Sequence, residues 1–192
     1  MNMLMRASIV AALVLAALVP SAFAQAFTYR VLATNKTSTM QMEMQEAGDA
    51  SFRFVAAMGG ETAIGGKEVV VLMEKAPDDT ARYEYRVQAT TKTSTLQKEL
   101  QEAGDAGFQV VGQTVFESTF GGKETAALLQ RTAGATTFDK YEYKLAATSK
   151  TSTMQKELQG LADQGFRAVG MTVGSTAIGG KELVVITRRK VE

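Results

Sequence analysis

The feature that most constrains the fold of this chain is an internal repeat with three copies. An aromatic, strand-like stretch and a Gly-Gly-Lys-Glu element recur in the same order along the sequence. Their first residues are Phe27, Gly65, Tyr83, Gly121, Tyr141 and Gly179. Both elements advance by 56 and then 58 residues, so the copies stay in register. Self-similarity of this kind predicts one supersecondary unit that is built three times.

Within each copy the hydrophobic period changes in a fixed order. In the second copy, residues 83–90 alternate between apolar and polar side chains, which predicts a half-buried strand. A helix with apolar side chains at i, i+4 and i+7 follows, and residues 108–115 and 124–130 complete the unit as two strands. The apolar helix positions are Met40, Met44, Ala47, Leu96, Leu100, Ala103, Met154, Leu158 and Leu161. Each copy is therefore predicted to be β-α-β-β, with the helix on one face of a small sheet.

The ends of the predicted helices carry capping signals. Ser94 is expected to be the N-cap, with Gln97 three residues later as in a capping box. The equivalent pairs are Ser38 with Gln41 and Ser152 with Gln155. Gly107 and Gly165 stand where a left-handed C-cap is wanted. The first copy has Ser51 there, so that helix end should be more strained or looser.

The composition of the last strands predicts that the copies pack together. Residues 69–73 and 183–186 are apolar on both faces, whereas one helix covers only one face of a sheet. A unit of about 55 residues also buries too little surface to be stable alone. We therefore expect an α+β fold of three tandem β-α-β-β repeats, in a pseudo-threefold or a continuous-sheet assembly. The repeats are assigned to residues 25–76, 83–131 and 141–192, and the linkers to residues 77–82 and 132–140.

Residues 1–24 are predicted to be a secretory signal peptide. They have a short basic start with Arg6, an apolar run over residues 7–19, and the sequence Ala22-Phe23-Ala24. The alternative is a membrane anchor, but the run is shorter than the roughly 18 to 20 residues that a spanning helix needs. Cleavage after Ala24 would place a bacterial protein in the periplasm or outside the cell, without an integral membrane segment.

Composition excludes several function classes. Without Arg6 the chain has 20 basic and 20 acidic side chains, which argues against nucleic-acid binding. The chain has no Cys and no His, so no disulfide, no Ser-His-Asp triad and no ordinary zinc, copper or haem site is expected. No cofactor is predicted. Carboxylate-only catalysis and calcium binding stay open, although no EF-hand-like run of acids is present.

The lysine-rich loops are the first candidate site. In a β-α-β-β unit, the loop before the helix and the hairpin between the last two strands lie at the same end of the sheet. Lysines and hydroxyls would gather there at a helix N-terminus, an arrangement that can hold a carboxylate, a phosphate or a sulfated sugar. The candidate residues are Lys36, Ser38, Lys67, Lys92, Ser94, Lys123, Lys150, Ser152 and Lys181. The alternative is that the serines cap, the lysines are solvated, and Glu68, Glu124 and Glu182 neutralise them.

Two further candidates have simpler interpretations. Met40, Met42 and Met44 could bind Cu(I), but Met40 and Met44 fall on the predicted buried face, which favours core packing. Glu43 and Asp49, with their equivalents in the other copies, could act as an acid and a base. On an exposed helix side, such carboxylates more often support the helix.

The third copy carries a pattern that resembles a known family. It has Tyr-Glu-Tyr-Lys from Tyr141, Lys-Glu-Leu-Gln from Lys156, a Gly-Phe that ends at Phe166, a strand with Val169 and a terminal Arg188-Arg189. This resembles the short bacterial domain-of-unknown-function family 4177, taken as three tandem copies over nearly all of the chain after residue 24. The family usually has Trp at the positions held here by Phe52, Phe108 and Phe166. The resemblance supports the fold and implies no activity.

The sequence therefore predicts an exported, non-enzymatic interaction or structural module that acts through repeated surfaces. Its partner would be another protein or a second copy of itself, because a weak surface offered several times gains by effective concentration. The alternative is a periplasmic protein that binds a small anionic ligand at the Lys-Thr-Ser-Thr and Gly-Gly-Lys loops. An enzyme comes third, since only carboxylates, lysines, tyrosines and hydroxyls could carry its chemistry.

Overall fold

The structure is a computed structural model that describes residues 26–63, 66–117, 122–175 and 181–191. Each third of the chain contains a strand, a helix and two more strands. The elements are β1 (Thr28–Thr34), α1 (Thr37–Asp49), β2 (Arg53–Thr62), β3 (Gly66–Lys75), β4 (Tyr83–Thr90), α2 (Thr93–Asp105), β5 (Gln109–Glu117), β6 (Lys123–Thr132), β7 (Lys140–Thr148), α3 (Thr151–Ala162), β8 (Arg167–Ser175) and β9 (Lys181–Val191). The α+β class is confirmed. The signal peptide predicted for residues 1–24 lies outside the described residues.

The strands form three separate sheets of three strands, which we call sheets A (β1–β3), B (β4–β6) and C (β7–β9). In each sheet the last strand lies in the middle and is antiparallel to both neighbours. The first and second strands therefore point the same way but are not adjacent. Because the sheets are separate, the continuous sheet allowed by the sequence does not form.

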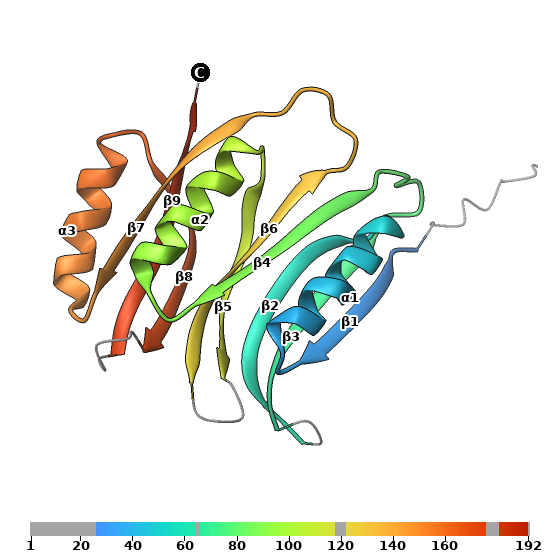
Figure 1. The fold of residues 1–192 in the computed structure, drawn as a ribbon, viewed down its shortest axis with the longest axis horizontal. Helices are drawn as coiled ribbons and strands as arrows, with labels where there is room; N and C mark the ends of the chain where they lie inside the picture. Colours follow the sequence, from blue (N-terminus) through green and yellow to red (C-terminus); the bar gives the residue numbers. More distant parts are fainter. Residues whose placement is uncertain (1–25, 64–65, 118–121, 176–180, 192) are drawn as a thin grey trace, which may run out of the picture.

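The three units lie in a row, from β1 at one end to α3 at the other (Figure 1). Helix α1 packs on β4 of the following unit, and α2 packs on β7. Strand β5 also lies against β2 and β3, and β8 lies against β5 and β6. The first and second units are thus each covered by the next unit in the sequence.

Each sheet has two faces that differ in what covers them. We call the face that carries the sheet's own helix the forward face, and the opposite face the back face. In β6, Ala127 and Leu129 of the forward face belong to the cluster around α2. Ala126 and Leu128 of the back face belong to the cluster around α1 of the preceding unit. Both faces of the middle of β6 are fully buried, which is why residues 126–129 are all apolar.

The apolar face of each helix is the one predicted from the sequence. Met40, Met44 and Ala47 of α1 are completely buried, as are the equivalent residues of α2. In α3 only Met154 is buried, and Leu158 and Leu161 are half-buried. The third helix is less covered because, within the described residues, no unit follows sheet C.

The predicted serine N-caps are wrong. The helices begin two residues earlier than predicted, so that Ser38, Ser94 and Ser152 lie inside the first turn and are exposed. The N-cap positions are held by Lys36, Lys92 and Lys150, without a side-chain cap hydrogen bond. The preceding threonines stabilise the turn instead, since the Oγ1 atoms of Thr34, Thr90 and Thr148 accept hydrogen bonds from the N–H of these lysines.

The left-handed helix ends are confirmed. Gly107 and Gly165 have φ angles of 81° and 84°, and Ser51 has a φ of 69° at the same place. The next residue closes the helix in each unit, as where the N–H of Phe52 donates to the carbonyl oxygen of Ala47 at 2.9 Å. Ser51, whose side chain is buried, therefore has a backbone conformation that favours glycine.

Ser51→Gly should stabilise the protein by about 1 kcal/mol, because glycine has no steric penalty at this φ. Thermal unfolding followed by circular dichroism would measure the change. Gly165→Ser in the third unit is the reciprocal variant, because a Cβ atom there would meet nothing within 4 Å, and it should destabilise by a similar amount. An unchanged melting temperature for Ser51→Gly would show that the buried hydroxyl compensates for the backbone strain.

No helix of the described residues is long and apolar enough to cross a lipid bilayer.

Candidate functional site

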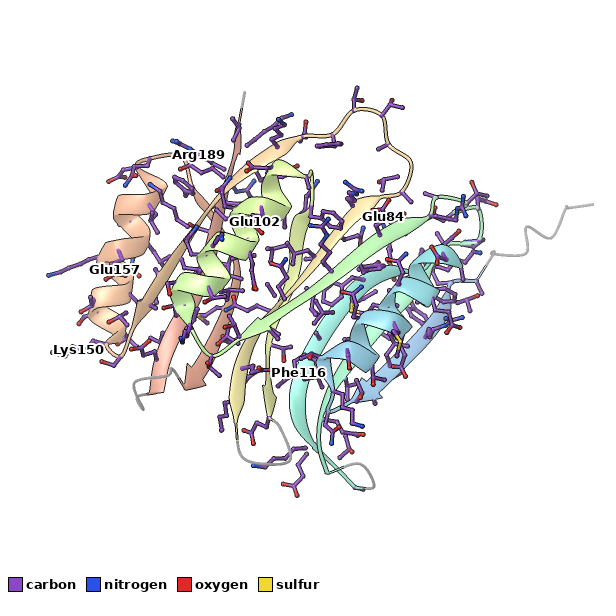
Figure 2. All side chains as sticks on the ribbon, in the orientation of Figure 1. Glu84, Glu102, Phe116, Lys150, Glu157 and Arg189 are labelled. Atoms are coloured by element: carbon purple, nitrogen blue, oxygen red, sulfur yellow. The ribbon has the colours of Figure 1, made fainter. Side chains whose placement is uncertain are left out.

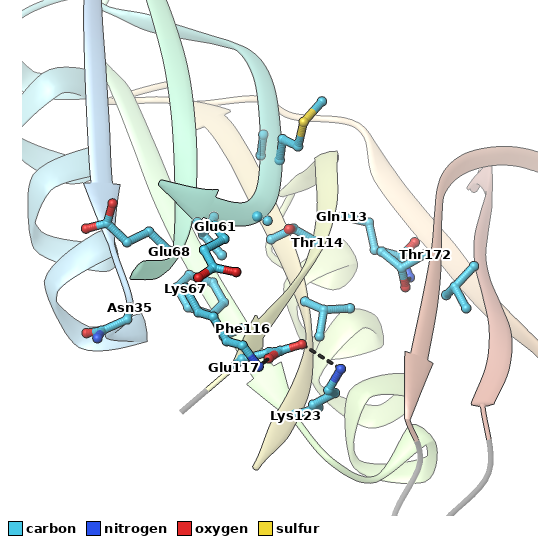
Figure 3. Close-up of a pocket in the computed structure, with 17 residues that line it drawn as sticks. Asn35, Glu61, Lys67, Glu68, Gln113, Thr114, Phe116, Glu117, Lys123 and Thr172 are labelled. Atoms are coloured by element: carbon cyan, nitrogen blue, oxygen red, sulfur yellow. Dashed lines mark hydrogen bonds and ion pairs between the residues drawn. The ribbon is translucent and has the colours of Figure 1, made fainter. Parts of the chain in front are cut away.

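The lysine-rich loops of the first two units meet at a cleft of about 500 Å³. It lies at the hairpin end of sheets A and B, and its walls include Asn35, Lys67, Glu117, Lys123 and Thr172 (Figure 3). Asn35 directly follows β1, and Lys67 lies at the start of β3, next to the hairpin. The loop before the helix and the hairpin therefore lie at the same end of the sheet, as predicted.

One carboxylate, that of Glu117, forms salt bridges with both lysines of this cleft. Glu117 Oε2 lies 2.5 Å from Lys67 Nζ, and its Oε1 lies 2.5 Å from Lys123 Nζ. These hydrogen bonds, first that of Lys123 and then that of Lys67, lower the pKa of the Glu117 carboxyl to about 2. Glu68, which the sequence suggested as a neutralising group, instead accepts a hydrogen bond from Thr62 at 2.5 Å. The two ammonium groups are therefore already paired with a carboxylate.

The other candidate residues whose side chains are described do not join this cluster. Lys36, Lys92 and Lys150 are exposed at the three helix starts, and Lys150 marks the outer end of the row (Figure 2). Ser38, Ser94 and Ser152 are also exposed. The side chain of Lys181 lies outside the described residues. The structure thus brings together lysines of neighbouring units, Lys67 with Lys123, rather than the two lysines of one unit.

The pairing of Glu117 should make stability depend on pH in the acid range. The folded pKa of about 2 is below the usual value of 4.5, so the ion pairs stabilise the fold above pH 4.5. This stabilisation is lost as the pH falls from 4.5 to about 2. Glu117→Gln should melt at a lower temperature than the native chain at pH 7, and the difference should vanish near pH 2. Melting temperatures that differ equally at every pH would contradict this prediction.

The described residues contain no cluster of three or more Asp or Glu side chains arranged to hold a metal ion. The thioethers of Met40 and Met44 are completely buried in the core, and only Met42 of that segment is exposed. This supports the packing interpretation of the methionines.

The second candidate site is the contact between each helix and the first strand of the next unit, which we call a joint. In the first joint, Gln41 Nε2 donates to the carbonyl oxygen of Tyr85 at 2.9 Å, and its Oε1 accepts from the N–H of Val87 at 2.7 Å. Gln45, one turn later, donates to the carbonyl oxygen of Tyr83 at 3.3 Å and accepts from the N–H of Tyr85 at 3.0 Å. The two side-chain amides follow the strand edge as a neighbouring strand would.

The second joint repeats this arrangement. Gln97 Nε2 donates to the carbonyl oxygen of Tyr143 at 2.7 Å, and its Oε1 accepts from the N–H of Leu145 at 2.9 Å. Gln101 donates to the carbonyl oxygen of Tyr141 at 3.4 Å and accepts from the N–H of Tyr143 at 3.2 Å. A strand edge that would otherwise present unpaired backbone groups is thereby closed.

Glycines allow the helix to come this close to the strand. A Cβ atom added to Gly104 would lie inside contact distance of the Tyr141 carbonyl oxygen and 2.9 Å from the Tyr143 ring. A Cβ atom on Gly48 would meet the Tyr83 carbonyl oxygen in the same way. These glycines are needed for close approach, in contrast to those at the helix ends.

A buried tyrosine completes each joint. The hydroxyl of Tyr143 donates to the carbonyl oxygen of Phe108 at 3.1 Å and accepts from the N–H of Val110 at 2.9 Å. The hydroxyl of Tyr85 donates to the carbonyl oxygen of Phe52 at 3.1 Å. Burial raises the pKa of both phenols above the usual value, so they stay neutral. Their role is to link one unit to the next.

Sequence reasoning missed the joints because it assigned Gln41, Gln97 and Gln155 to capping boxes. The available signal was a second glutamine four residues later, followed after another four residues by an aspartate. The residues of this second pattern are Gln45, Asp49, Gln101, Asp105, Gln159 and Asp163. A capping box accounts for the first glutamine of each helix but gives no role to the second, which was the signal for another function.

The two ends of the row each carry half of a joint. At one end, β1 has a hydrogen-bonded neighbour strand on one side only within the described residues, and Tyr29 and Val31 are 58% and 64% exposed. At the other end, Gln155 and Gln159 of α3 are exposed.

The comparisons with known proteins add no assignment: the chain matches no family model, no curated protein and no solved structure. The resemblance to the domain-of-unknown-function family 4177 stays a prediction.

Proposed function

We propose that this chain is an exported, non-enzymatic interaction or structural module that acts through its repeated surfaces. The observation that carries the proposal is the joint, which occurs twice inside the chain and, among the described residues, leaves one open half at each end of the row. A fold that repeats one kind of contact surface, and whose described residues leave that surface uncovered at both ends, is suited to binding partners.

The head surface is made of residues on the back face and outer edge of sheet A. Tyr29, Val31 and Met58 are 58%, 64% and 75% exposed. The equivalents of Tyr29 in the other units, Tyr85 and Tyr143, are 2% and 1% exposed because the preceding unit covers them. Apolar surface of this kind marks an interaction site more often than a catalytic one.

A small-ligand role at the lysine-rich loops has weaker support. The cleft holds two lysines, but Glu117 is bound to both, and its low pKa keeps it charged at neutral pH. An incoming anion would have to displace this carboxylate.

The proposal is tested by photo-crosslinking in the cells that make the protein. A photoreactive amino acid at position 31 probes the head surface, one at position 155 probes α3, and one at position 98 is the control. Lys98 is the α2 residue next to Gln97, and its side chain is 80% exposed. We expect discrete protein adducts at positions 31 and 155 and none at position 98. Equal labelling at all three positions, or no adducts, would contradict the proposed function.

A further inference from the structure

The open ends of the row are complementary halves of the same joint. The head surface, defined above by Tyr29, Val31 and Met58, corresponds to the back face that sheets B and C use inside the chain. We call Gln155, Gln159, Met171 and Val173 the tail surface, which corresponds to the helix and forward face of the first two units. Met171 and Val173 are each 65% exposed.

The tail surface retains the polar groups of a joint. In α1 and α2, the second glutamine is oriented by the aspartate four residues later, with Gln45 Nε2 to Asp49 Oδ1 at 3.0 Å and Gln101 Nε2 to Asp105 Oδ1 at 2.9 Å. In α3, Gln159 Nε2 donates to its own aspartate at 3.1 Å, although no described strand lies against this helix side. The amide is therefore oriented for a strand edge that the described part of the chain does not supply.

The head surface retains the matching strand. Tyr29 and Val31 of β1 occupy the positions of Tyr85 and Val87 in β4, whose backbone groups bond to the glutamines of α1. In the described part of the chain, the outer edge of β1 has no strand neighbour. The N–H and carbonyl groups of β1 have the same spacing as those of β4. Residues 27, 29 and 31 could therefore bond to the side-chain amides of Gln155 and Gln159, as residues 83, 85 and 87 bond to those of Gln41 and Gln45.

From these correspondences we infer that the tail surface binds the head surface of a second copy of this chain, in the manner of the two internal joints. The inference rests on the proposed function and identifies its partner. A second copy is favoured because both halves of the contact are present on one chain and their complementarity is displayed twice within it. Such a head-to-tail contact is heterologous, so it continues into open or closed chains of molecules.

One difference between α3 and the first two helices should weaken the contact between copies. At the position of Gly48 and Gly104, α3 has Ala162, whose methyl group would meet the incoming carbonyl oxygen of residue 27. The incoming strand must then stand slightly farther from the helix than in the internal joints. The contact between copies is therefore weaker than those within the chain, and Ala162→Gly should strengthen it.

The test is the mass of the purified chain over a concentration series, measured by sedimentation velocity and light scattering. We expect the average mass of the native chain to rise with concentration. Ala162→Gly should raise the association constant about tenfold, as expected for removal of a steric overlap. Gln155→Ala with Gln159→Ala should lower it by at least about tenfold. A native chain that stays monomeric, or association unaffected by these changes, would overturn the inference.

The direction of the contact is tested with two matched variants. Val31→Lys blocks the head surface and Val173→Lys blocks the tail surface, and both valines are about equally exposed, at 64% and 65%. Each variant alone should be monomeric. Their mixture should form dimers that grow no further, because each partner retains one working end. A mixture that stays monomeric, or self-association of either variant alone, would contradict a head-to-tail contact. Unchanged circular dichroism and melting temperature would show that both variants fold.

The two proposals fail in different ways. Adducts at positions 31 and 155 in cells, combined with a purified chain that never associates, would refute the second copy as partner and leave the interaction function standing. The absence of adducts in cells would remove the proposed function itself.

Discussion

Gly104→Ala should destabilise the protein by about 3 kcal/mol. The new methyl group would overlap the carbonyl oxygen of Tyr141 and press on the ring of Tyr143, both held by the second joint. Overpacking of this kind costs about 1 to 3 kcal/mol, and displacement of the strand would also weaken the hydrogen bonds of Gln97 and Gln101. Chemical denaturation monitored by tyrosine fluorescence and circular dichroism would measure the loss.

Gly160→Ala is the matched control for this prediction. Gly160 lies inside α3 and a Cβ atom there would meet nothing within 4 Å. The substitution should therefore stabilise the helix by up to about 1 kcal/mol, as expected from helix propensity alone. If Gly104→Ala were as harmless as Gly160→Ala, the close approach of α2 to β7 would not contribute to the stability of the fold.

The double variant Gln97→Ala with Gln101→Ala should also destabilise the protein by about 3 kcal/mol. It leaves two N–H and two carbonyl groups of β7 without their partners, among them both backbone groups of Tyr143, and each unpaired buried group costs about 1 to 3 kcal/mol. Water that enters the opened edge would bond to part of these groups, which keeps the total loss below the sum of the four separate costs. Equilibrium unfolding in urea would give the value.

The third helix provides the control, because Gln155→Ala with Gln159→Ala makes the same chemical change at exposed positions. Measured at concentrations where the chain is monomeric, this variant should change stability by less than about 0.5 kcal/mol. Equal losses for the two double variants would mean that the glutamines act within their own helices rather than on the following strand.

The sequence was sufficient for the elements because hydrophobic periodicity is a local property. Leu96 and Leu100 of α2 are spaced for one helical face, and both are completely buried. The left-handed helix end at Ser51 was also predictable, since glycine holds the same position in the other two copies.

The helix starts were not predictable because several hydroxyls compete there. The segment around Lys92 offers Thr90, Thr91, Thr93, Ser94 and Thr95 within a few residues. Any of them could accept a hydrogen bond, and only the backbone geometry selects Thr90. A rule based on residue type cannot separate such neighbours.

The sites between units were hidden for another reason. Glu117 faces Lys123 within sheet B, but Lys67 reaches the same carboxylate only because sheet B lies across sheet A, and the sequence does not show this offset. Likewise, Gln97 is an ordinary helix residue until β7 lies beside it. The repeat predicted that the units pack, but the packing direction comes from contacts such as the glutamine hydrogen bonds of the joints, which link residues 38 to 48 positions apart in the chain.

The one-way direction of the joints has a consequence for protein synthesis. When the ribosome has released the first unit, Gln41 and Gln45 still lack the strand that they bond, and that strand, Tyr83–Thr90, is the next one to emerge. Each newly made unit therefore completes the one before it, and folding can advance in the order of translation. Within the described fold, α3 is the one helix that no later strand completes, so its glutamines stay exposed when the rest of the fold is finished.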